Sequence, residues 1–173
     1  MSTEEPTILT RGLPVWVVRT TVAVAIVAIG VLLAAQGVSG VLLGILGLVG
    51  TLCVLVPASP APAMVIIATA GSVALVAPDP LAVGVLALLP LVHVVHIGSA
   101  VAAVIPGTAR IHLAALRPAM IRFVVVQLGT FALAGVAAIV PNATTPTVFE
   151  AAGLLGAALL ALIAARLIMK RPL

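Results

Sequence analysis

The sequence is poor in charged residues, aromatic residues and cysteine. Charged residues make up 7% of its 173 residues and aromatic residues 2%, and it contains no tyrosine. A soluble domain needs a charged surface, so this composition, with 64% hydrophobic residues, excludes an ordinary globular protein. The net charge of +4 belongs to basic residues that flank apolar runs, which favours lipid headgroups over nucleic acid as partners. The single Cys53 lies in an apolar run and excludes an intrachain disulfide.

Catalytic and cofactor-binding patterns are also missing. The sequence has no Walker A, G-x-S-x-G, C-x-x-C or H-E-x-x-H pattern. No acidic residue lies deep in an apolar run, which argues against a carrier that binds a coupling ion on a buried carboxylate. With three histidines and no acid or cysteine beside them, a four-ligand zinc site is not expected. We therefore predict a protein that is not an enzyme and holds no cofactor or metal.

Long apolar runs are what the chain does contain. Several exceed the ~18 residues that are typical of a transmembrane helix. We predict an all-α integral membrane protein, a bundle of six transmembrane helices at residues 13–35, 40–56, 61–77, 80–105, 118–140 and 147–169. Residues 1–12 are predicted to be a short disordered cytoplasmic tail, and residues 13–173 a single transmembrane domain.

The third run has only 17 residues, the lower limit for a crossing, and a re-entrant segment is the alternative. Charge favours the crossing. If this run spans, all eight basic residues fall on one side of the membrane, as the positive-inside bias predicts. Both termini are then cytoplasmic.

Proline and aspartate suggest several helix boundaries. We expect Pro14 in the first turn of the first helix, and Asp79 as the N-cap of the fourth with Pro80 at its first position. Residues 108–117 are predicted to be a loop that forms a short interfacial helix at most, so that the fifth helix begins at Pro118.

The ends of the runs carry residues that are typical of membrane interfaces. We expect them to anchor the helices and to bind anionic headgroups at the cytoplasmic face. They are Trp16, Arg19, Arg110, Arg117, Arg122, Lys170 and Arg171. The acidic start MSTEEP does not resemble a signal peptide, so the first helix is expected to stay as an anchor. Seven arginines against one lysine indicate a high-GC bacterial genome, and hence its cytoplasmic membrane.

Small residues recur at three- and four-residue steps in two of the runs. They predict faces on which a neighbouring helix can approach closely, although glycine is common in membrane helices in any case. The predicted faces are Gly40, Gly44 and Gly47 in the second helix, and Gly153, Ala157 and Ala161 in the sixth.

Polar residues deep in an apolar run are few and gather in the fourth and fifth helices. His93 and His96 share a helix face. They follow Pro90, which removes one backbone hydrogen bond of the helix. Counting 1.5 Å per residue places Gln127 at an overlapping depth. The predicted polar niche is Pro90, His93, His96, Ser99 and Gln127. Its histidines are either interhelical hydrogen-bonders, with Gln127, Ser99, Thr20 or Thr21 as partners, or the lining of a solute path.

Two functions remain open from sequence. The first is an accessory or scaffold subunit of a bacterial membrane complex, which contacts other subunits or a second copy through its small-residue faces. The second is a small-solute transporter or channel with Pro90, His93, His96 and Gln127 along its path. The sequence resembles no family that would decide between them.

Overall fold

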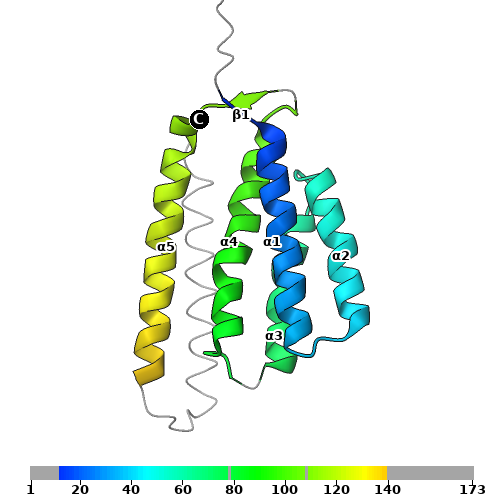
Figure 1. The fold of residues 1–173 in the computed structure, drawn as a ribbon, viewed down its shortest axis with the longest axis vertical. Helices are drawn as coiled ribbons and strands as arrows, with labels where there is room; N and C mark the ends of the chain where they lie inside the picture. Colours follow the sequence, from blue (N-terminus) through cyan, green and yellow to red (C-terminus); the bar gives the residue numbers. More distant parts are fainter. Residues whose placement is uncertain (1–11, 78, 108, 140–173) are drawn as a thin grey trace, which may run out of the picture. The chain divides into compact units, whose positions relative to one another are not determined.

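The computed structural model describes residues 12–77, 79–107 and 109–139, and this part of the chain is helical apart from one short ribbon (Figure 1). The helices are α1 (Val15–Ala35), α2 (Gly40–Leu55), α3 (Ala61–Val76), α4 (Val83–Val104) and α5 (Leu113–Ile139). The two strands, β1 (Leu13–Pro14) and β2 (Arg110–Ile111), pair antiparallel. Nearly all of this belongs to the first of two compact units, Met1–Ala137, and the single domain expected over residues 13–173 stays a prediction.

Three of the described helices are long and apolar enough to cross a membrane, namely α1, α4 and α5. Helices α2 and α3 have 16 residues each. At 1.5 Å per residue they reach about 24 Å, which is shorter than the ~30 Å hydrocarbon core. The predicted count of six crossings is therefore not supported, and the helix predicted at residues 147–169 lies outside the described residues.

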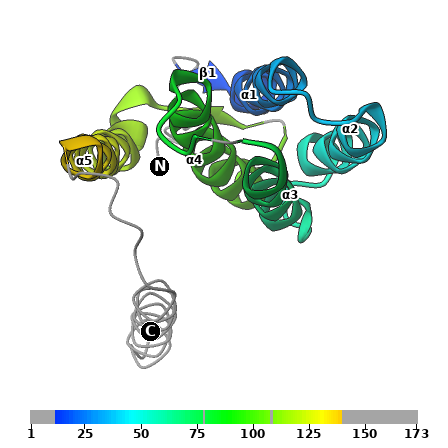
Figure 2. The same cartoon turned by 90° about the horizontal axis from the view of Figure 1, so that it is seen from below.

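Helices α1 to α4 form a ring in which each helix packs against the next (Figure 2). Helix α1 contacts both α2 and α4, and α3 closes the ring between those two. The α1 side chains that enter the core recur at steps of three and four residues, as one face of a helix requires. They are Val22, Ala25, Ile26, Ile29 and Leu33.

Two glycines let the neighbouring helices approach α1. A Cβ added to Gly50 of α2 would lie 2.5 Å from Cγ2 of Ile26, and one added to Gly98 of α4 would lie 2.5 Å from Cγ2 of Val22. Both distances are far below van der Waals contact, so these positions require glycine at the observed spacing. The sequence analysis assigned the close approach of helices to Gly40, Gly44 and Gly47, and it missed Gly50 and Gly98.

Helix boundaries agree with expectation at α2 and α3 and differ elsewhere. Pro14 is the extended N-cap of α1 and part of β1, so it lies before the first turn. The N-cap of α4 is Ala82, and Asp79 instead accepts a 2.8 Å hydrogen bond from the Leu81 amide in a turn before the helix. The predicted capping role of Asp79 and the predicted start at Pro80 are therefore wrong.

The predicted loop at residues 108–117 is the larger correction. Residues 110–111 form β2, and α5 already begins at Leu113, with Pro118 inside the helix. The segment Leu-Ala-Ala-Leu-Arg at 113–117 consists of strong helix formers. A proline this near the N-terminus removes a single intrahelical hydrogen bond, so the helix can begin ahead of it.

We predict that Gly98→Ala destabilises the protein and Gly71→Ala does not. Val22 is β-branched and stiff in a helix, so its methyl group cannot swing away from a new Cβ, and overpacking of this kind costs roughly 1–3 kcal/mol. Gly71 has no described atom within 4 Å of an added Cβ, so it gains only the helix preference of alanine. Thermal unfolding in detergent measures both. Equal stability of the two variants would contradict the close approach at Gly98.

Candidate functional site

The predicted polar niche is built around one hydrogen bond between α4 and α5. Nε2 of Gln127 lies 3.1 Å from Nδ1 of His93 and donates to it when the ring proton is on the other nitrogen. Gln127 is the buried residue of α5, with 9% of its surface exposed. The amide of Gln127 is thus turned toward the imidazole of the neighbouring helix.

A second residue of α5 contacts the same imidazole. The rings of Phe123 and His93 have centroids 4.9 Å apart and planes inclined by 31°. Phe123 and Gln127 are four residues apart and therefore share a face of α5. This face of α5 therefore contacts His93 twice, through the hydrogen bond of Gln127 to Nδ1 and through the ring of Phe123.

The niche leaves one buried polar atom unmatched. Oε1 of Gln127 is buried and has no hydrogen-bond partner among the described residues. Turning the amide over would exchange the roles of Oε1 and Nε2, and one of the two would still lack a partner. An unmatched buried group is costly and calls for a partner from outside the described residues, such as water, a ligand or another chain.

His96 has a different environment from His93. It is exposed and has no hydrogen-bond partner in the described part of the chain. It borders a hollow of about 240 Å³ together with His93, Gln127 and Thr130. It also borders one hollow between α3 and α4 and another beside Arg122 of α5. The two histidines share one side of α4, but only His93 is paired.

The remaining predicted partners lie elsewhere. Ser99 is buried and lines the α3–α4 hollow with His96, but its Oγ lies 3.3 Å from Sγ of Cys53 in α2 and is not bonded to either histidine. Thr20 and Thr21 each donate to a carbonyl four residues back in α1 and do not reach the histidines. Pro90 lies inside the continuous α4. Sequence reasoning missed the Cys53–Ser99 contact, because nothing in the pattern of either helix links these two positions.

The four arginines of the described chain gather at the end that holds the β1–β2 ribbon. Arg110 donates to the Gly12 carbonyl at 3.5 Å, and Arg117 and Arg122 are exposed on the first turns of α5. Arg19 is half-buried, and its Nε has no partner within the described ranges. Asp79, the one carboxylate among the described residues, lies at the opposite end of α4. Of the other predicted anchors, Trp16 is exposed, while Lys170 and Arg171 lie outside the described residues.

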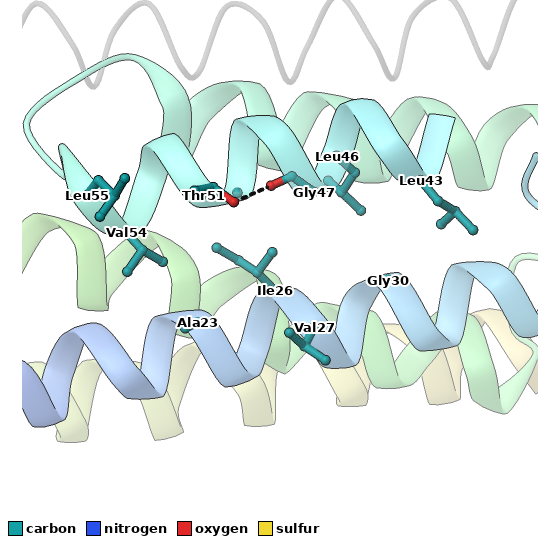
Figure 3. Close-up of a pocket in the computed structure, with 11 residues that line it drawn as sticks. Ala23, Ile26, Val27, Gly30, Leu43, Leu46, Gly47, Thr51, Val54 and Leu55 are labelled. Atoms are coloured by element: carbon teal, nitrogen blue, oxygen red, sulfur yellow. Dashed lines mark hydrogen bonds between the residues drawn. The ribbon is translucent and has the colours of Figure 1, made fainter. Parts of the chain in front are cut away.

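The predicted glycine face of α2 borders open space. A Cβ added to Gly40, Gly44 or Gly47 would meet no described atom within 4 Å. Beside it lies a groove of about 400 Å³ between α1 and α2, which we call the α1–α2 groove. Figure 3 shows Ile26 pointing across this groove and the hydroxyl of Thr51 bonded to the Gly47 carbonyl, a distance of 2.8 Å. Gly153, Ala157 and Ala161 lie outside the described residues.

The described side chains bring together no group of three or more His, Cys, Asp or Glu residues that could hold a metal ion. The groups that the described niche offers are imidazole and amide groups, which form hydrogen bonds. Among the described residues, no carboxylate lies beside them to act as a base.

We predict that His93→Leu costs more stability than His96→Leu. Losing His93 removes its bond to Gln127 at a cost of about 1 kcal/mol, the size of an interhelical hydrogen bond in a membrane protein. His96 has no described partner to lose. A double-mutant cycle with Gln127→Leu, followed by unfolding in detergent, should give a coupling energy for His93 and none for His96. Equal coupling for both would contradict the pairing.

Comparisons with known proteins find no matching family model, no matching curated protein and no matching solved structure. The chain is thus characterised by its helices, three of which are long and apolar enough to cross a membrane, and by the polar and small-residue features described above.

Proposed function

We propose that this is a multi-pass protein of a bacterial cytoplasmic membrane that acts as a non-enzymatic accessory or scaffold subunit. The observation that supports it is the open glycine face of α2, where Gly40, Gly44 and Gly47 border open space and Gly47 lines the α1–α2 groove. The partner is a transmembrane helix of another subunit, and a second copy of this chain is the alternative.

The chemistry of the groove suits a helix better than a polar solute. Its lining is apolar or small, and the hydroxyl of Thr51 is already bonded within α2. Helices in lipid associate by close van der Waals packing, because lipid tails are as apolar as the side chains. Glycines without neighbours allow the backbone of a partner to approach, whereas larger side chains would hold it away.

The scaffold function predicts that Gly44→Leu with Gly47→Leu abolishes partner recovery. The tagged full-length protein is purified in mild detergent after cross-linking in its own membrane, and the bound proteins are identified. The double variant should lose the specific partner because leucine fills the approach surface. Gly71→Leu is the matched control, since Gly71 of α3 is also exposed with open space around it but lies away from the groove.

Loss of the partner in both variants would indicate a general effect on the protein and would count against this surface. A monomer without any partner in the wild type would refute the scaffold function. A dimer of this chain that depends on Gly44 and Gly47 would assign the face to self-association.

A small-solute transporter or channel is the second candidate, favoured by the unmatched Oε1 of Gln127 beside the hollow that His93 and His96 line. A solute or water passing this point would supply the missing hydrogen bond.

The transport function predicts solute-driven swelling of proteoliposomes that contain the purified protein. Replacing both His93 and His96 with alanine should abolish swelling while the protein still inserts. Replacing Thr20 and Thr21, which bond only their own helix, is the control and should leave swelling unchanged. Swelling that survives the histidine double variant would remove the niche from the path.

A further inference from the structure

One hollow between α4 and α5 combines a guanidinium, an imidazole and an apolar wall. This α4–α5 hollow has a volume of about 300 Å³. Arg122 and His96 border it, together with Ile97, Ala100, Val101, Val104 and Ala119. Its lining is therefore amphiphilic, unlike that of the α1–α2 groove.

The two polar groups of this hollow lie at the same height. His96 is eight residues from the end of α4, or about 12 Å, and Arg122 is nine residues from the start of α5, or about 14 Å. Both ends adjoin the segment with the β1–β2 ribbon, where the described arginines gather. A guanidinium at this depth can extend along its aliphatic stem toward the interface.

No described group neutralises Arg122. It has no hydrogen-bond or ion-pair partner among the described residues. The described carboxylate, Asp79, precedes α4, whose first residue is about 20 Å from His96 along the helix. A permanent positive charge inside a span needs an anion. The planar N–H donors of the Arg122 guanidinium match the oxygens of a phosphate group.

We propose that the α4–α5 hollow binds one anionic phospholipid, with its phosphate on Arg122 and His96 and an acyl chain against the wall formed by Ala100 and Val104. Basic pockets between transmembrane helices are typical sites for anionic headgroups. Five of the seven lining residues are apolar, which favours a lipid over free phosphate, because free phosphate would use only the two polar groups. The site lies on α4 and α5, so it is independent of the scaffold function assigned to α1 and α2.

Native mass spectrometry of the full chain tests the site. The protein is purified in mild detergent, and phosphatidylglycerol or phosphatidylcholine is added. We expect a one-to-one complex with phosphatidylglycerol that Arg122→Gln weakens on the order of tenfold, since a charge-assisted hydrogen bond is lost. Arg117→Gln is the matched control, because Arg117 is exposed on the same helix and does not border the hollow. It should leave the complex unchanged.

A pair of steric variants tests the apolar wall without touching charge. Ala100→Leu fills the hollow and should also weaken the complex, whereas Ala103→Leu, at an exposed position of α4 outside the hollow, should not. This pair decides the question if Arg122→Gln fails to fold.

Three results would overturn the proposal. Equal weakening by Arg117→Gln and Arg122→Gln would show unspecific attraction to negative charge. Equal binding of the two lipids would exclude an anionic headgroup site. Inorganic phosphate that binds through Arg122 where phosphatidylglycerol does not would assign the site to the free anion.

Discussion

The contact of α1 with two glycines is the constraint on which the rest of the helical ring depends. Ile26 occupies the space that a side chain at Gly50 would need, and Val22 does the same at Gly98. In lipid there is no hydrophobic force that pushes apolar helices together, so the fit of such surfaces has to stabilise the contact. Because both contacts lie on one stripe of α1, this helix is fixed to α2 and α4 at once, and α3 fills the remaining side.

Polar groups in the helices are satisfied in two ways. Hydroxyl groups on Thr21, Thr51, Thr69 and Thr130 return to a carbonyl four residues back in their own helix, which leaves them no role between helices. The amide of Gln36 also bonds a carbonyl four residues back, that of Leu32, but the described part of the chain gives the His93 imidazole and the Gln127 amide no such local bond, and these two groups meet each other instead. That difference explains why the niche, and not the more numerous threonines, connects α4 to α5.

Sequence predicted the five described helices and the pairing of His93 with Gln127, and its failures have identifiable causes. The bounds of α2 and α3 follow from proline and glycine at their ends. The β1–β2 ribbon joins segments about a hundred residues apart, and no local pattern records such a pairing. The pairing of His93 with Gln127 could be predicted, because a rise of 1.5 Å per residue places both side chains at the same depth. Ser99 follows His93 by six residues, about 240° around the helix, so helical geometry alone assigns it to another face.

The attachment of α5 suggests where the functional surfaces of this part of the chain lie. Its N-terminal end is tied to the start of α1 through the ribbon, and its middle is tied to α4 through Gln127 and Phe123. Between these two points the seam with α4 contains the hollow at Arg122, and further along it the hollow at Gln127. A helix held at separate points keeps space beside it that neighbouring residues do not fill. Each of these spaces contains a polar group without a partner in the described chain, so we expect their occupants to be molecules that supply hydrogen bonds or charge.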